Sequence, residues 1–360
     1  MMEPSFQIVA KHSAEWPRNS EGSVAVFPDG RWLLTWSAFY DGFHDHSSAR
    51  LMGRWSSDRG ESWGEPFISL ENDGKRNVLS TSVAVLSDGS VGYAHSRTDD
   101  DTCFYAWPYF RRSVDGGRTF SPHQVMVDMD TWHGFPANGR LIELSSGRLL
   151  VPLQLNTKTN TGAGESHVQS AYSDDKGESW KLSSNVASLR GTAEQDGTTP
   201  SHAAEPDAFE RRDGTIMFLI RTRLGTIYAA DSVDGGETLS ETYDTGLESP
   251  GSPCTVARIP GSEDVLLVWN KAQPQSPGSG GPRTPLTTAI SRDDGKTWGN
   301  FKDLEPPAGQ SHMYPALAFD GETALVLYSE GEINSVDKWS TNWHNTSLKL
   351  ARVPIPWLYE

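Results

Sequence analysis

The chain has 360 residues, a formal net charge of −16 and a pI near 5.0. Such an acidic protein lacks the basic face that nucleic-acid binding requires, and it is disfavoured at an anionic membrane surface. An acidic small molecule can still bind if clustered arginines overcome the overall field.

The composition favours a protein of many short strands. Gly 34, Pro 22 and Trp 13 are high counts for a helical protein, and apolar residues make up 36 %. The two cysteines, Cys103 and Cys254, are too few for a disulfide framework. We find no apolar run long enough to span a membrane and no signal-peptide pattern. We therefore expect a cytoplasmic protein, or a periplasmic or secreted one if the chain has been shortened at its N-terminus.

Two interleaved repeats follow along the chain. The first is Ser-x-Asp-x-Gly-x-(Ser/Thr)-aromatic, at residues 56–63, 113–120, 173–180 and 291–298, with a fifth copy at 232–239 that ends in leucine. The second is a tight turn that leads into an apolar strand. It occurs six times, in FPDGRWLLTW, LSDGSVGYAH, LSSGRLLVPL, RRDGTIMFLI, PGSEDVLLVW and FDGETALVLY.

Six units of about 60 residues, each long enough for four strands, predict a six-bladed β-propeller that forms one domain over residues 1–360. The segment FQIVAKH is expected to add a strand to the last blade, and SVDKWS at 335–340 is a degenerate remnant of the first repeat. The repeat aspartates should bind turn backbone N–H groups and are interpreted as structural. They are Asp58, Asp115, Asp174, Asp234 and Asp293.

Ligand sites in propellers lie where the central strands converge, so charged residues near the strand ends are candidates. Arg18 precedes the first turn, Arg221 ends the fourth apolar strand, and Arg283 precedes the fifth repeat. Each alone is an ordinary surface or ion-pair arginine, but three that meet on one axis would form a cage for a carboxylate. Asp45, Glu205 and Tyr314 lie in the loops and strands that lead to the same axis.

This arrangement resembles the sialidase (neuraminidase) superfamily, in which the first repeat is called the Asp-box. The resemblance covers essentially the whole chain, but Asp-boxes indicate the fold and not the activity. The family motif Arg-Ile-Pro is matched only by the arginine of PRNSEG, which is Arg18. The spacing of Glu205 and Arg221, sixteen residues apart, matches the family more closely, as does the YPAL segment that begins at Tyr314.

The resemblance implies a retaining exo-glycosidase that acts on a terminal acidic sugar, with no cofactor and no metal. Tyr314 would be the nucleophile, Glu205 its base and Asp45 the acid/base residue, with Asp41 as a rival. The three arginines would hold the carboxylate of the sugar. A neutral tyrosine suits this role because the substrate carboxylate repels an anionic nucleophile, whereas the acid/base aspartate needs a raised pKa.

Histidines in the expected site loops leave alternatives open. His133 and His202 are assigned to substrate binding, and His44, His46 and His312 lie in similar loops. Several histidines together are compatible with another acidic sugar, or with a polysaccharide lyase acting on a uronate. A metal site among Asp41, His44, Asp45 and His46 and a non-catalytic glycan-binding propeller are further alternatives. The oligomeric state is not predicted.

Overall fold

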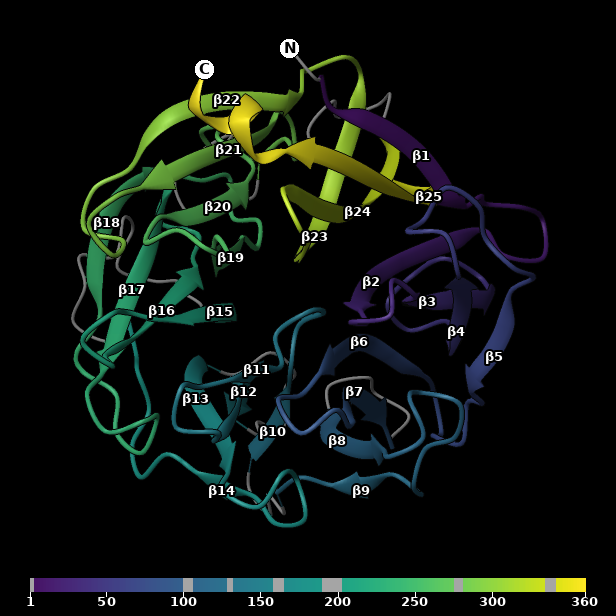
Figure 1. The fold of residues 1–360 in the computed structure, drawn as a ribbon, viewed down its shortest axis with the longest axis horizontal. Helices are drawn as coiled ribbons and strands as arrows, with labels where there is room; N and C mark the ends of the chain where they lie inside the picture. Colours follow the sequence, from purple (N-terminus) through teal and green to yellow (C-terminus); the bar gives the residue numbers. More distant parts are fainter. Residues whose placement is uncertain are drawn as a thin grey trace.

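The computed structural model describes residues 3–99, 106–127, 132–157, 165–189, 203–274, 281–333 and 341–360. These residues form β-strands and one short 3-10 helix, η1 (Ile355–Tyr359). The sheets are arranged as a propeller around a central axis (Figure 1). The expectation of an all-β propeller is therefore confirmed. No helix in the described part of the chain is long and apolar enough to cross a membrane.

Four of the sheets contain only strands that are consecutive in sequence. The first comprises β6 (Val78–Val85), β7 (Val91–Thr98), β8 (Ala106–Ser113) and β9 (Gln124–Val125). The second comprises β10 (Trp132–Phe135), β11 (Ile142–Glu143), β12 (Leu149–Thr157), β13 (Ser166–Ser173) and β14 (Lys181–Leu182). The third comprises β15 (Ala204–Glu210), β16 (Ile216–Arg221), β17 (Thr226–Ser232) and β18 (Tyr243–Glu248). The fourth comprises β19 (Thr255–Arg258), β20 (Val265–Trp269), β21 (Leu286–Ser291) and β22 (Gly299–Glu305).

The fifth sheet has eight strands and joins the two ends of the chain. It contains β1 (Ser5–Ala10), β2 (Arg18–Val26), β3 (Trp32–Asp41), β4 (Ser48–Ser56), β5 (Phe67–Leu70), β23 (Gln310–Asp320), β24 (Thr323–Ile333) and β25 (Thr341–Pro354). As predicted, the N-terminal strand β1 pairs antiparallel with β25, in the last unit. The described residues thus form five hydrogen-bonded sheets, so the count of six blades stays a prediction.

The hydrophobic core lies between neighbouring sheets. All five residues of β20 are fully buried, and the five apolar residues of β16 are at most 1 % exposed. A propeller strand is covered on both faces by adjacent sheets, which is why these strands are apolar at every position rather than at alternate ones. All six predicted turn-to-strand segments are confirmed, because β3, β7, β12, β16, β20 and β24 each follow their turn.

The Ser-x-Asp turns close by side-chain hydrogen bonds. In the first, Asp58 accepts bonds from the Ser56 hydroxyl and from the Ser62 hydroxyl and N–H, and these donors lower the pKa of Asp58 to about 2. The same bonds recur at four other aspartates: Asp115, Asp175, Asp234 and Asp293. Asp174, expected from the sequence to be the aspartate of the third copy, is the wrong residue. Asp174 instead pairs with Arg148, and Asp175 occupies the third position of the repeat.

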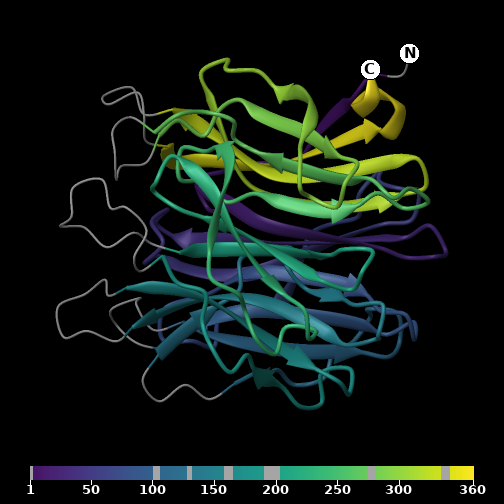
Figure 2. The same ribbon diagram turned by 90° about the vertical axis from the view of Figure 1, so that its left-hand side faces the viewer.

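Each sheet extends from a strand near the axis to a strand at the rim. Figure 1 shows β2, β6, β15, β19 and β23 nearest the centre, with β5, β9, β14, β18 and β22 at the rim. In the side view of Figure 2 the strands span the thickness of the ring, and both termini lie close together. Glu205 is at the start of β15 and Glu210 at its end, so these residues mark opposite ends of the propeller.

A buried arginine ties several units together near the axis. Arg140 is fully buried and donates to the carbonyls of Asn138, Pro315 and Cys254. Its Nη1 also lies 3.5 Å from a carboxylate oxygen of Asp207. Burial raises the pKa of Asp207, while the charge of Arg140 and backbone N–H donors oppose that rise. Arg140 therefore offsets the charge of a buried carboxylate and donates to carbonyls from three separate segments of the chain.

We predict that Arg140→Met destabilises the fold by about 3–5 kcal/mol, because it leaves the Asp207 carboxylate buried without its cation. The midpoint of urea unfolding measures this effect. Arg118→Met is the control, since Arg118 is exposed and its loss should change stability by no more than about 0.5 kcal/mol. Equal urea midpoints for Arg140→Met and the unsubstituted protein would contradict the role of Arg140 in stabilising the buried Asp207 carboxylate.

Candidate functional site

Four inner strands share an unusual backbone feature at one end of the propeller. The strands β2, β6, β15 and β23 each contain a bulge, and at each bulge a non-glycine residue has a positive φ. These residues are Glu21, Ser80, Glu205 and Tyr314, with φ of 55°, 58°, 37° and 53°. A bulge re-aims a side chain, and left-handed non-glycine residues gather at functional sites. The bulges therefore mark a candidate site.

Tyr314 is a buried phenol that faces a carboxylate. Its hydroxyl donates to Oε1 of Glu205 over 3.3 Å, and the residue is 9 % exposed. Burial raises the pKa of Tyr314, and the negative charge of Glu205 raises it further. The phenol therefore stays protonated at neutral pH and can act as a nucleophile only if a base takes its proton. Glu205 is in position to be that base.

Glu205 also pairs with an arginine of its own hairpin. The guanidinium of Arg221, the last residue of β16, donates to Oε2 of Glu205 through Nη1. β15 and β16 are antiparallel, and Ala204 is opposite Arg221, so the two residues sixteen positions apart lie side by side. The sequence directs Glu205 and Arg221 to one site through their spacing, and their ion pair is a finding of the structure. The contacts form a continuous chain from Arg221 through Glu205 to Tyr314.

Arg18 is the most enclosed of the three predicted arginines, with no exposed surface. Its Nε donates to Ser20 over 3.1 Å, and its Nη2 donates to Glu21 over 2.9 Å. Its Nη1 donates to the carbonyl of Phe43 over 3.2 Å and to Asp45 over 2.6 Å. Arg18 is therefore held by its own strand on one side and by the loop after β3 on the other.

Glu21 is a site carboxylate that the sequence did not reveal. It is 6 % exposed and accepts hydrogen bonds from Arg18 and from the hydroxyl of Ser80, the latter over 2.7 Å. Burial raises the pKa of Glu21, although the charge of Arg18 opposes the rise. The available signal was its place three residues after Arg18 within PRNSEG, but such spacing is common and does not by itself indicate a site.

Asp45 contacts Arg18 from an exposed loop. Its side chain is 68 % exposed, and Oδ1 accepts the 2.6 Å bond from Arg18. Partial desolvation opposes ionisation of Asp45, but the charge and hydrogen bond of Arg18 outweigh that effect and hold the pKa below its usual value. The expectation of a raised pKa is therefore wrong for this arrangement. The rival, Asp41, is an exposed residue at the end of β3.

Arg283 differs from the other two arginines because it has no carboxylate partner in the part of the chain that the structure describes. Its Nη1 is buried and has no hydrogen-bond partner among the described residues. The guanidinium carbon lies 5.2 Å from the ring centre of Tyr314 and 5.4 Å from that of Trp343. Arg283 is therefore a cation beside the phenol whose hydrogen-bonding capacity is not filled.

Trp343 is a second residue that the sequence did not reveal. Its ring centre lies 4.0 Å from the guanidinium carbon of Arg18 and 6.0 Å from the ring of Tyr314. Phe39 is on another side of Arg18 at 4.3 Å. Because Arg18 and Arg283 both contact the indole of Trp343, the two cations face a common region next to Tyr314.

The predicted histidines are placed differently. His133 lies in β10, opposite Asn156, and the contacts of its side chain are outside the described residues. His202 also lies outside the described residues. His44 and His46 are exposed in the loop that carries Asp45. Neither substrate-binding assignment, of His133 or of His202, is tested by the structure.

His312 belongs to a buried ionic cluster rather than to a loop. Its Nε2 lies 3.5 Å from Glu330 and 3.9 Å from Glu305. Among the described residues, these three alone bring metal-ligating atoms within 4.8 Å of one another. However, Lys349 Nζ contacts both carboxylates, at 2.5 and 2.7 Å, and already supplies the positive charge. The metal hypothesis for Asp41, His44, Asp45 and His46 gains no support from this arrangement.

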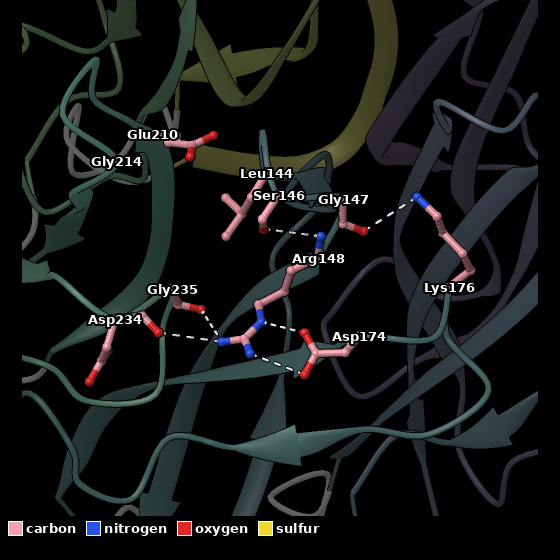
Figure 3. A pocket seen from close by; sticks show the side chains of 10 residues that line it. All are labelled: Leu144, Ser146, Gly147, Arg148, Asp174, Lys176, Glu210, Gly214, Asp234 and Gly235. Carbon is pink, nitrogen blue, oxygen red and sulfur yellow. Dashed lines mark hydrogen bonds and ion pairs between the residues drawn. The ribbon is translucent and has the colours of Figure 1, made fainter.

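A polar groove of about 550 Å³ lies at the opposite end of the propeller (Figure 3). Figure 3 shows Arg148 reaching across it to Asp174 and to the carbonyls of Asp234 and Gly235. Arg148 also donates to Glu237, so every nitrogen of its guanidinium is engaged. The groove is therefore interpreted as a structural junction between two sheets.

The sequence matches the family described as "BNR repeat-like domain" over residues 91–327, which is about two thirds of the chain. It is also similar to a protein named sialidase from Micromonospora viridifaciens, with 28 % identity over 86 % of this chain and 49 % of that protein. An anhydrosialidase from Macrobdella decora is 33 % identical over 55 % of this chain and 24 % of that protein. The chain thus spans about half and a quarter of the lengths of these two relatives.

The fold is shared with solved structures. An intramolecular trans-sialidase from Ruminococcus gnavus superimposes with a TM-score of 0.73 and covers 98 % of both chains. Its sequence identity is 16 %, so this likeness describes the fold alone.

We predict that the ionic cluster of His312, Glu305, Glu330 and Lys349 contributes to the free energy of unfolding in a pH-dependent way. The hydrogen bond from His312 is the largest of the effects that lower the pKa of Glu330 to about 2, and Lys349 adds to it. The resulting stabilisation is present above the unfolded pKa near 4.5 and is lost as the pH falls towards 2. Glu330→Gln should therefore lower stability by up to about 3 kcal/mol at pH 7.

Thermal unfolding between pH 7 and pH 3 measures the effect of Glu330→Gln, and the deficit should shrink with acidification. Glu332→Gln is the matched control, because Glu332 is exposed on the same strand. A deficit that stays constant from pH 7 to pH 3 would rule out this account.

Proposed function

The chain belongs to the BNR repeat-like family of the sialidase superfamily, and on that premise we propose that it is a retaining exo-glycosidase. Its substrate is a glycan that ends in a sialic acid or a related carboxylated sugar. The names of the two curated relatives support a carbohydrate substrate of this class. The three arginines, brought to one site in an acidic protein, are the cationic surface that such a sugar needs.

One observation carries the proposal, which is the chain of contacts from Arg221 through Glu205 to the Tyr314 hydroxyl. A buried phenol beside a carboxylate is a nucleophile with its base. Arg283, whose Nη1 has no partner among the described residues and lies next to the same ring, provides a place for the carboxylate of the sugar.

In the first step the Tyr314 oxygen attacks the anomeric carbon as its proton passes to Glu205. The bond to the leaving oxygen breaks, and Asp45 protonates that oxygen. Charge accumulates on an oxocarbenium-like centre next to the sugar carboxylate, which the guanidiniums neutralise. A carboxylate nucleophile would be repelled by the sugar carboxylate, and this is why a phenol serves here.

In the second step Asp45 takes a proton from water, and the hydroxide attacks the anomeric carbon. The bond to Tyr314 breaks, and the phenolate regains its proton from Glu205. Two displacements at one carbon give retention of configuration. Arg18, Arg221 and Arg283 hold the substrate through both steps, and His133 and His202 remain proposed contacts of the sugar.

Two finer features of the fold belong to the same proposal. The eight-stranded sheet counts as two blades, because β2 and β25 pair only between Arg18 and Thr346. That division gives six blades. The five turns closed by Asp58, Asp115, Asp175, Asp234 and Asp293 are assigned as Asp-boxes.

We predict that Tyr314→Phe abolishes hydrolysis of an aryl sialoside, because the variant has no nucleophilic oxygen. Glu205→Gln should lower kcat about 10²- to 10⁴-fold, since the phenol keeps its proton. Release of the aryl group measures both. Tyr243→Phe, on the rim strand β18, is the matched control and should retain full activity.

Product analysis separates the proposal from its alternatives. Release of the acidic sugar with retained configuration supports hydrolysis, and an anhydro sugar would match the activity in the name of the Macrobdella relative. An unsaturated uronate product would instead indicate a lyase. Binding of acidic oligosaccharides without turnover would indicate a glycan-binding protein, and full activity of Tyr314→Phe would refute the assigned nucleophile.

A further inference from the structure

The charges of the candidate site are balanced in number but unevenly distributed. Three arginines face three carboxylates. Arg18 contacts two of them, Glu21 and Asp45. Arg221 pairs with Glu205, while Arg283 has no ion pair among the described residues. An acidic ligand therefore finds Arg283 available for an ion pair. At Arg18 it finds a guanidinium that two carboxylates already contact.

Arg18 has no room for an additional anion. Its side chain is completely buried, its Nε, Nη1 and Nη2 all donate to protein oxygens, and Phe39 and Trp343 stack on it. A ligand carboxylate can reach this guanidinium only by replacing one of the oxygens that now contact it.

The two carboxylates on Arg18 differ in how firmly they are held. Glu21 is buried in the bulge of β2, and its other oxygen accepts a bond from Ser80. The Asp45 side chain is 68 % exposed, and Arg18 provides the one hydrogen bond to its carboxylate among the described residues. Asp45 is therefore the exchangeable partner and Glu21 the fixed one.

The loop permits this exchange without unfolding. Asn77 donates to the carbonyls of Asp45 and Ser47, over 2.8 and 3.1 Å, and so holds the loop backbone in place. A turn of the Asp45 side chain alone then releases Nη1 of Arg18. The carbonyl of Phe43 accepts from the same nitrogen and remains beside it.

We propose that the Asp45 carboxylate occupies the position that the carboxylate of an acidic sugar takes on Arg18, and that the ligand binds by displacing it. This inference rests on the proposed function and deepens it. A sugar without a negative charge cannot compete for Arg18, so Asp45 makes the site selective for acids. Glu21 acts as the positioning residue that keeps Arg18 in place during the exchange.

Displacement also explains how the Asp45 carboxyl can become protonated. Once it leaves Arg18, Asp45 loses the charge and the hydrogen bond that lower its pKa, and it has a ligand carboxylate as its neighbour instead. Both changes favour the protonated form. Ligand binding thus converts Asp45 from a counter-ion into a proton donor, which is the role that the glycosidase mechanism assigns to it.

Asp45→Asn tests the proposal, because asparagine keeps the shape of the side chain but removes its charge. Binding of N-acetylneuraminic acid, measured by calorimetry, should become about tenfold tighter, since no internal anion competes for Arg18. The same variant should lose at least about 100-fold in turnover of an aryl sialoside, because the proton donor is gone. The methyl ester of the sugar should show no gain in affinity.

Two controls distinguish displacement from a general charge effect. Asp244→Asn removes an exposed charge on the rim strand β18 and should leave the Kd unchanged. Glu21→Gln removes the other anion on Arg18, and it should not tighten binding, because the fixed partner is not the one displaced. Thermal unfolding at pH 7 verifies that each variant is folded.

The outcomes separate this inference from the proposed function. If the unsubstituted protein binds the sugar but Asp45→Asn binds it equally or more weakly, displacement is refuted while the glycosidase assignment stands. Equal tightening in Asp45→Asn and Glu21→Gln also refutes it. If neither the unsubstituted protein nor Asp45→Asn binds or cleaves any acidic sugar, both proposals fail.

Discussion

The site depends on a backbone constraint, which is that non-glycine residues at the bulges of four inner strands have a positive φ. A non-glycine residue in this conformation costs about 1–3 kcal/mol, so the surrounding fold must compensate for it. Beneath Tyr314, the Asn138 side chain donates to the Tyr314 carbonyl, and Arg140 donates to the carbonyl of Pro315. The buried axis thus holds the strained segment that carries Tyr314, and the same bulge geometry brings Glu205 within reach of its phenol.

The electrostatics of the site follow from differences in burial. The protein carries a net charge of −16, yet three arginines meet at one end of the axis. Tyr314 and Glu21 are buried, and burial raises the pKa of each, whereas Asp45 is exposed and has a lowered pKa through Arg18. Three environments thus shift the pKa values of three acidic groups by different causes. Acid–base chemistry at neutral pH needs groups whose pKa values are separated in this way.

The hydrogen-bonded turns and the candidate site lie at opposite ends of the propeller. The Ser-x-Asp turns and the Arg148 junction lie at one end, where their hydrogen-bonding groups are satisfied by one another. The bulges lie at the other end, where Nη1 of Arg283 is left without a partner among the described residues. A propeller can carry a strained, polar site because the strands between the two ends are apolar and buried on both faces.

The sequence by itself determined the repeated turns and the apolar strands, because each rests on contacts within one hairpin or one repeat. It brought Glu205 and Arg221 to one site through a spacing that matches a family, but it did not predict their ion pair. It also selected Arg18, Arg283, Asp45 and Tyr314 by resemblance to a family. It did not reveal Glu21 or Trp343, and it misjudged the direction of the pKa shift of Asp45. Trp343 meets Arg18 only once β25 lies beside β2. The environment of Glu21 includes Ser80 of the next sheet, and the pKa of Asp45 depends on a side-chain contact between its loop and Arg18, which the sequence pattern does not specify. The local sequence pattern determines which strands form. The burial and the charged neighbours of each site residue are determined only when the sheets assemble into the ring.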